Sequence, residues 1–143
     1  MPTIKIKMER VLLAAALCLA LPLAALATVQ DFGKFTVDVP EGWTATPDGT
    51  TVAIVADDSS GAVTVTIEPL EGYDIKDLAE AMAQQLKGTA PQLDDDVYTF
   101  TFTNVNGVES VVIMSDNGTD YLTLSITGEG ETLENIVQSI AFK

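Results

Sequence analysis

Alternating apolar and polar residues mark the first β-strands of the chain. Every second residue is apolar in Phe35–Val39, and Val63–Ile67 repeats this pattern with threonines between the apolar positions. Because successive side chains of a strand point to opposite faces, each segment should bury one face and leave the other wet. A shorter apolar strand is expected at Thr51–Ala56, between the turn-forming runs Pro47–Gly49 and Asp57–Gly61. The first part of the chain therefore predicts a meander.

The period changes to that of a helix between Asp74 and Lys87. Apolar residues recur there on one stripe, at Ile75, Leu78, Met82 and Leu86. Asp74 can cap this helix and Gly88 can end it. A second, shorter helix is expected from about Glu131 to Ser139, and the residues Ile140–Phe142 should return as a last edge strand.

Three further strands are expected between the two helices, at Val97–Asn104, Val108–Ser115 and Tyr121–Thr127. The pairs Asn106-Gly107 and Asn117-Gly118 connect them, and both residue types tolerate the positive φ that tight hairpins require. These strands should be antiparallel neighbours. The order of three or four strands, a helix, three strands, a helix and a strand predicts an α+β fold, in which an antiparallel meander has its apolar face covered by two helices.

The first 27 residues have the parts of a cleavable signal peptide. A basic start with Lys5, Lys7 and Arg10 precedes an apolar stretch over residues 11–21, and Ala25-Leu26-Ala27 forms an A-x-A cleavage site. Cleavage is expected between Ala27 and Thr28. The remaining residues 28–143 should then form a single domain that works in the periplasm or as a secreted protein.

Two other interpretations of this segment are an uncleaved membrane anchor and a lipoprotein. An uncleaved membrane anchor would need about 20 apolar residues, whereas the apolar run here covers residues 11–27 and is interrupted by Pro22. Lipid attachment at Cys18 would normally require a small residue before the cysteine, and Leu17 stands there instead. We therefore expect no stable membrane span after cleavage.

The acidity of the chain limits its partners. Its formal charge is −14, and the loss of Lys5, Lys7, Arg10 and Glu9 with the signal would bring this to −16. Nucleic acid and anionic lipid surfaces would repel such a domain, since binding them depends on Lys and Arg. The charge either serves solubility or favours a protein partner with a basic surface.

The residue types present exclude most catalytic chemistry. The chain has no histidine, and its one cysteine is Cys18, so a Ser-His-Asp triad, a Cys-His pair and the usual zinc sites cannot be built after cleavage. For the same reason no disulfide can stabilise the domain, which must rely on one packed core. A hydrolase that uses two carboxylates remains as a third function class. No cofactor is expected.

Two acidic loops are candidates for weak cation binding. Asp94, Asp95 and Asp96 stand just before a predicted strand, and calcium accepts such oxygen ligands. Three consecutive aspartates point in different directions, however, whereas an EF-hand loop alternates its ligands. The run Asp116–Asp120 has alternate oxygens but is better explained as a hairpin turn. Both are interpreted as solvated loops, and a weak divalent-cation or small-ligand site is the alternative.

Four aromatic residues are candidates for a partner-binding surface. Trp43 is the only tryptophan, and it either anchors a partner or packs as a plug on the sheet edge. Tyr98, Phe100 and Phe102 share one face of a predicted strand. That face should be the core side of the sheet, and any uncovered part of it would form a hydrophobic groove.

Two sequence motifs carry a family resemblance over nearly all of residues 28–143. The opening "FTVDVPEGW", with Phe35, Pro40, Gly42 and Trp43, and the closing "NIVQSIAFK" flank a mid-chain helix. This arrangement resembles the Mog/PsbP-like fold group, which includes PsbP, DcrB and Eag-type bacterial domains. The resemblance implies a non-catalytic accessory or binding role and carries over no functional residue. The sequence thus predicts an exported domain that docks on a protein partner.

Overall fold

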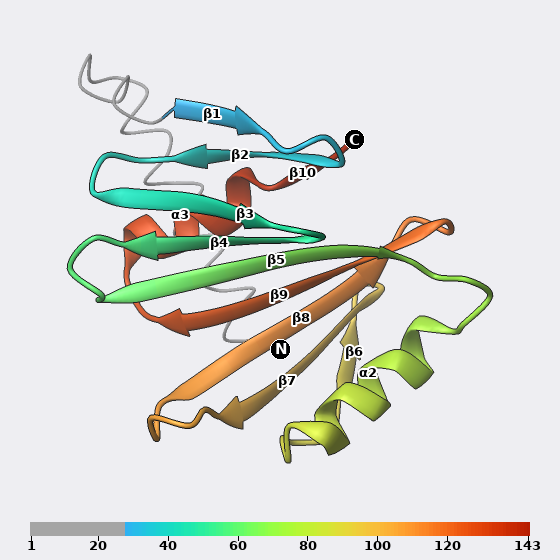
Figure 1. Ribbon diagram of the computed structural model, residues 1–143. Helices are drawn as coiled ribbons and strands as arrows, with labels where there is room; N and C mark the ends of the chain where they lie inside the picture. Colours follow the sequence, from blue (N-terminus) through green and yellow to red (C-terminus); the bar gives the residue numbers. More distant parts are fainter. Residues whose placement is uncertain (1–27) are drawn as a thin grey trace.

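The computed structural model describes residues 28–143, which form an α+β domain with two antiparallel sheets and two helices (Figure 1). The small sheet has the order β1-β2-β10, with β1 at Thr28–Asp31, β2 at Phe35–Val39 and β10 at Ala141–Phe142. The predicted fold class is confirmed. The signal peptide, its cleavage site and Cys18 lie outside the described residues.

The large sheet has seven strands in the order β3-β4-β5-β9-β8-β7-β6, and every pairing is antiparallel. Its strands are β3 (Trp43–Asp48), β4 (Thr51–Ala56), β5 (Gly61–Pro69), β6 (Gln92–Asp94), β7 (Val97–Thr103), β8 (Glu109–Asp116) and β9 (Asp120–Gly128). The predicted neighbours β7, β8 and β9 are confirmed. Helix α2 spans Ile75–Gln85 between β5 and β6, and α3 spans Glu131–Ser139 between β9 and β10, as the apolar spacing predicted.

Strands β1, β3 and β6 were not among the predicted elements, because each lies at the edge of a sheet and lacks a regular apolar alternation. In β3, Pro47 and Asp48 were interpreted as part of a turn. Pro47 is tolerated there because an outer strand has one side on which no ladder hydrogen bond is needed. The turn itself is shorter and consists of Gly49 and Thr50, since Asp48 already pairs with Thr51.

The ends of α2 confirm one sequence prediction and correct another. The Oδ1 atom of Asp74 accepts a hydrogen bond from the Lys76 N–H at 2.8 Å, as expected for an N-cap. At the other end, Lys87 rather than Gly88 takes the left-handed conformation, with a φ of +56°. Gly88 is required for a different reason: a Cβ at this position would lie 2.5 Å from the carbonyl oxygen of Thr101. The glycine therefore lets the chain leave α2 in close contact with β7.

The hairpin turns also differ from the prediction. Positive φ occurs at Gly107 and Gly118 but not at the asparagines before them, so neither pair forms a turn with two positive φ values. Such a turn is made instead by Asp95 and Asp96, whose φ values are +51° and +64° and which connect β6 directly to β7. Aspartate can adopt this conformation because its short polar side chain forms local hydrogen bonds.

The apolar side chains form two cores on opposite faces of the large sheet, where the sequence predicted one. Val65, Leu124 and Ile113 are cross-strand neighbours on one face, and α3 and β2 cover this face around β4 and β5. The first core consists of Phe35, Val37, Val39, Val52, Ile54, Val63, Val65, Ile67, Leu122, Leu124, Leu133 and Ile136.

The second core lies on the other face, under α2. Phe100, Val112 and Ser125 are cross-strand neighbours there, one residue out of phase with the first core. The buried members are Ala79, Ala83, Phe100, Val112 and Met114. Figure 1 shows the two helices on the two sides of the sheet, α2 in front and α3 behind. The domain has two cores because each helix covers a different face of the large sheet.

The front face of β3, β4 and β5 bears mainly threonine and alanine, and no described helix packs on it. Thr51 and Thr66 share a hydrogen bond of 2.9 Å across two strands, which matches the predicted wet face of Val63–Ile67. Among residues 28–143, neither helix has the length and apolar character needed to cross a membrane.

Candidate partner-binding surface

The aromatic stripe of β7 is mostly covered by α2. Phe100 is 1% exposed and belongs to the second core, whereas Tyr98 and Phe102 are half-buried and pack against that core. Phe100 therefore has no surface to offer a partner in this conformation. Only the outer parts of Tyr98 and Phe102 are open, because α2 crosses the middle of the stripe.

Trp43 lies at the start of β3, where the chain leaves the turn that follows β2. Its N–H donates to the carbonyl oxygen of Pro40 at 3.2 Å, and its side chain is half-buried against the first core. The ring tip reaches Gly61, at which a Cβ would lie 3.1 Å from the Trp43 Cη2 atom. The ring is therefore both packed on the sheet edge and partly open to solvent.

A cleft of about 380 Å³ opens beside Trp43, and we call it the Trp43 cleft. Three connections meet there, namely the β2–β3 turn, the β4–β5 turn and the β9–α3 link. Its lining residues are Glu41, Gly42, Trp43, Ala56, Asp58, Ser60, Glu129, Gly130, Glu131, Thr132 and Leu133. The cleft combines an aromatic wall with a largely polar rim.

The rim of the Trp43 cleft carries negative charge. Glu41, Asp58, Glu129 and Glu131 line it, and neither lysine nor arginine does. Hydrogen bonds donated by the hydroxyl and the N–H of Ser60 hold the pKa of Asp58 below its ordinary value of 3.8. Asp57 lies next to this group, since its N–H donates to the Gly42 carbonyl oxygen at 2.8 Å. The cleft is therefore anionic at neutral pH.

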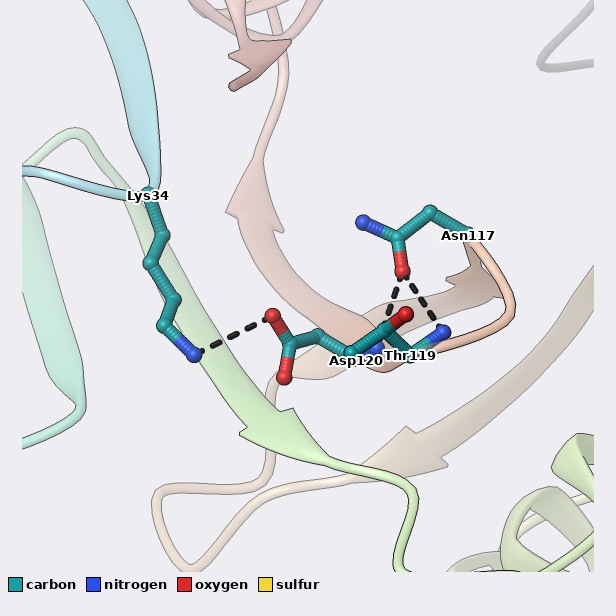
Figure 2. A network of polar contacts seen from close by, with 4 residues as sticks. All are labelled: Lys34, Asn117, Thr119 and Asp120. Carbon is teal, nitrogen blue, oxygen red and sulfur yellow. Dashed lines mark hydrogen bonds and ion pairs between the residues drawn. The ribbon is translucent and has the colours of Figure 1, made fainter.

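The lysines of the described chain lie elsewhere. Lys34 pairs with Asp120 at 3.1 Å, and Figure 2 shows this contact beside the turn in which Asn117 Oδ1 accepts the N–H groups of Thr119 and Asp120. Lys143 pairs with Asp31 at 2.7 Å, and Lys76 approaches Glu80 at 4.0 Å. Charge is thus distributed unevenly, with the lysines away from the Trp43 cleft.

A second hollow of about 390 Å³ lies at the end of α2 and contains Lys87. Glu80, Gln84 and Thr89 also line it, so it mixes both signs of charge. None of the four predicted aromatic residues lines this hollow. This hollow therefore differs from the Trp43 cleft, which combines an aromatic side chain with negative charge alone.

The acidic loops are built as turns. Asp95 and Asp96 form the β6–β7 turn, and Asp94 ends β6. In the other loop, Asp116 Oδ2 accepts the Gly118 N–H and Asp120 binds Lys34. Within residues 28–143, no group of three or more acidic side chains is placed to hold a metal ion. The geometry of the described chain gives the cation-binding alternative no support.

Trp43 was predictable from the sequence as a site residue, but the carboxylates around it were not. Glu41, Asp58 and Glu129 lie in three turns that are far apart in sequence, and only the strand pairing brings these turns together. One local signal was available, because the runs Pro40-Glu41-Gly42 and Gly128–Glu131 both place acidic residues among glycines at predicted element ends. That signal does not show that the two runs are neighbours.

Comparisons with known proteins identify the fold. No protein-family model and no curated protein matches the sequence. A Bacteroides thetaiotaomicron crystal structure is similar at a TM-score of 0.53 with 14% identity, over 82% of this chain and 48% of that one. This chain thus spans about half the length of the Bacteroides protein. The solution structure of cyanobacterial PsbP (CyanoP) from Synechocystis sp. PCC 6803 is similar at a TM-score of 0.54 with 10% identity, over 83% of this chain and 94% of that one. The domain therefore has the PsbP-like fold.

Proposed function

We propose that this protein is an exported, non-catalytic accessory domain that binds a protein partner with a basic surface at the Trp43 cleft. The observation that carries the proposal is the arrangement of Trp43 among four carboxylates with no basic residue in the lining. A tryptophan can supply apolar contact area at the centre of an interface. Rim carboxylates attract a cationic partner and fix its orientation.

The Trp43 cleft suits binding better than catalysis. A carboxylate hydrolase needs one carboxyl group that stays protonated near neutral pH, so its pKa must be raised. The hydrogen bonds from Ser60 act in the opposite direction on Asp58. Asp58 therefore does not fit the part of the protonated acid. The absence of this role for Asp58 favours the non-catalytic assignment.

The proposal includes export, with cleavage between Ala27 and Thr28 and a periplasmic or secreted location. The intact mass of the protein recovered after expression in a bacterium with a secretion system tests this part. We expect a chain that starts at Thr28 and carries no lipid. A diacylglycerol adduct on Cys18, or an intact N-terminus, would contradict it.

Fluorescence of Trp43 tests the binding function directly, because this residue is the only tryptophan in the chain. We expect a decapeptide of alternating arginine and glycine to change the emission at low salt, and a matched glutamate–glycine peptide to leave it unchanged. Sodium chloride should weaken this binding chiefly by slowing association, since added salt screens long-range attraction.

Charge variants separate a specific cleft from the general acidity of the domain. Replacing Glu41, Glu129 and Glu131 together by glutamine should weaken peptide binding by tenfold or more. The matched control replaces Glu71, Glu80 and Glu109, which are also exposed and lie outside the Trp43 cleft. Equal losses in both triple variants would show that net charge alone attracts the peptide, and the cleft would then not be the binding site.

A further inference from the structure

We propose that β1 is a dimerisation edge, at which two copies of the chain pair their β1 strands antiparallel across a two-fold axis. The two small sheets would then form one continuous sheet of six strands, since each has three. This surface is separate from the Trp43 cleft, whose lining includes no residue of β1.

Comparison of the sheet edges singles out β1. Exposed edges are normally protected from pairing by proline, charge, bulges or short length. Strand β3 contains Pro47, β6 has three residues between Pro91 and its aspartate turn, and β10 has two residues. Strand β1 has four residues and contains neither proline nor lysine, its one charged residue, Asp31, is paired with Lys143, and its Val29 is 66% exposed. Among the described edges, β1 is thus the least protected against a second strand.

The hydrogen-bond pattern shows which groups of β1 point outward. The Phe32 N–H donates to the Phe35 carbonyl oxygen at 3.0 Å, which makes this pair the hydrogen-bonded pair next to the turn. Bonded and non-bonded pairs alternate along an antiparallel ladder. Gln30 and Thr28 therefore bond to β2, whereas the N–H and C=O groups of Val29 and Asp31 point to the free edge.

A second hydrogen bond independently supports this assignment of bonded and non-bonded pairs between β1 and β2. Val29 is opposite Asp38 in the register, and the Asp38 N–H donates to Ser139 Oγ at 2.9 Å, away from β1. The Val29–Asp38 pair is accordingly a non-bonded pair. Both observations assign the same two residues of β1 to its outer edge.

The outward groups are complementary to those of a second copy. With a two-fold axis at Gln30, Val29 of one copy faces Asp31 of the other, and each such pair can exchange two N–H···O=C bonds. The axis generates the pair twice, so four hydrogen bonds form in all. Gln30 then lies opposite Gln30 of the second copy as a close, non-bonded pair.

Local charge favours a second copy at this edge despite the acidity of the whole chain. Asp31 is neutralised by Lys143 at 2.7 Å, and Lys34 lies in the turn that follows β1. The hydrogen bond from Lys143, together with the Gly33 N–H, holds the pKa of Asp31 below 3.8, so the pair persists at neutral pH. Two copies consequently meet at an edge whose one carboxylate is paired with a lysine in each copy.

Cysteine cross-linking tests the register. In a Cys18→Ala background, Gln30→Cys should give a disulfide-linked dimer under mild oxidation, because Cα atoms of a non-bonded pair lie about 4.5 Å apart. Val29→Cys is the matched control. Its Cα atoms would be two residues out of register and about 8 Å apart, beyond the reach of a disulfide. Equal cross-linking of both variants, or of neither, would overturn the proposed pairing.

Sedimentation velocity of the exported protein from 10 to 1000 μM tests the dimer without a cross-link. We expect a reversible dimer that strengthens in 0.5 M NaCl, because salt screens the repulsion between like-charged copies. Salt should weaken binding of the arginine peptide, so the two proposals can fail separately. A monomer throughout this range, at both salt concentrations, would overturn the dimer.

Two substitutions at Val29 complete the test. Val29→Pro removes an outward N–H that β2 does not need, and Val29→Lys adds a charge to the edge. Each should weaken the dimer at least tenfold while thermal unfolding stays close to that of the wild type. Val105→Lys is the control, since Val105 is fully exposed in the β7–β8 turn. A dimer that survives both Val29 substitutions does not form through β1.

Discussion

The two helices of this domain are attached to opposite faces of one sheet by cores of different composition. Helix α3 contributes Leu133 and Ile136 to a core of mainly aliphatic side chains that also includes the buried face of β2. Helix α2 contributes Ala79 and Ala83 as its fully buried residues, and these face Phe100, Val112 and Met114. On the α3 side, both the helix and the sheet bury large apolar side chains. On the α2 side, the large buried side chains come from the sheet.

This difference has a physical consequence for each helix. Buried apolar area sets most of the packing free energy, so α3 and β2 should unfold only with the whole domain. Alanines let α2 approach the sheet closely but bury little area of their own, and the larger residues Ile75, Leu78 and Met82 are only partly buried against this core. Helix α2 should therefore open locally before the rest of the domain does, and the following substitutions test this comparison.

The largest effect is expected from Phe100→Ala. Phe100 is fully buried under α2, so its loss should lower the free energy of unfolding by about 3 to 5 kcal/mol. Phe102→Ala is the matched control on the same strand face, and its half-exposed side chain should cost clearly less. Urea unfolding of both variants provides the measurement. Equal losses would show that α2 does not cover the aromatic stripe as described.

A smaller effect should follow from Ala79→Leu, which tests the close approach of α2. Ala79 is completely buried between the helix and the sheet, and overpacking such a site costs about 1 to 3 kcal/mol. Hydrogen exchange should show faster exchange in α2 than in α3. Ala81→Leu, at an exposed position of the same helix, should leave exchange unchanged. Uniformly faster exchange in both helices would contradict independent opening of α2.

The Lys34–Asp120 ion pair should contribute less again, although it connects the β1–β2 turn to β9 (Figure 2). Lys34 is 56% exposed at its side chain, and exposed pairs contribute about 0.2 to 1 kcal/mol. A double-mutant cycle with Lys34→Met and Asp120→Asn measures the coupling, which should fall in 0.5 M NaCl. A coupling above this range would mean that the pair is a major link between the two sheets.

The smallest effect concerns Tyr121, which packs against the second core and donates to Glu68 at 2.9 Å. Burial, and then this hydrogen bond, raise the pKa of Tyr121 above its ordinary value of 10.0. The folded state therefore favours the neutral phenol. Its contribution to stability is complete below pH 10 and is lost as the pH rises through the folded-state pKa. Tyr121→Phe should have a flatter stability profile from pH 9 to 11.5, and identical slopes would contradict this assignment.

Much of the fold could be predicted because the relevant signals are local. Asp74 before an apolar stripe predicted the start of α2, and the α3 boundaries followed from its apolar spacing. The antiparallel order of β7, β8 and β9 followed from short polar connections. Strands β1, β3 and β6 were missed because none of them has a regular alternation of apolar and polar residues.

The candidate site could be predicted only in part. Trp43 was identifiable as the sole tryptophan in a turn-rich segment, but its half-buried position depends on Gly61, which is distant in sequence. Phe100 was correctly placed on the core side of β7, yet nothing local indicated that α2 would cover it more completely than Tyr98 and Phe102. Exposure is a property of what packs above a strand, and that element comes from another part of the chain.

The sequence by itself determined the α+β class, both helices, the buried faces of β2 and β5, and a strong negative charge without histidine. These properties depend on residue identity and on spacing within a few residues, so they are present before any long-range contact forms. Only the tertiary structure decided that the helices take opposite faces, that three acidic turns converge around Trp43, and that β1 lies at the edge of its sheet within residues 28–143. Each of these depends on how strands that are distant in the chain pair and curve. The register between two strands decides which side chains and which backbone groups become neighbours.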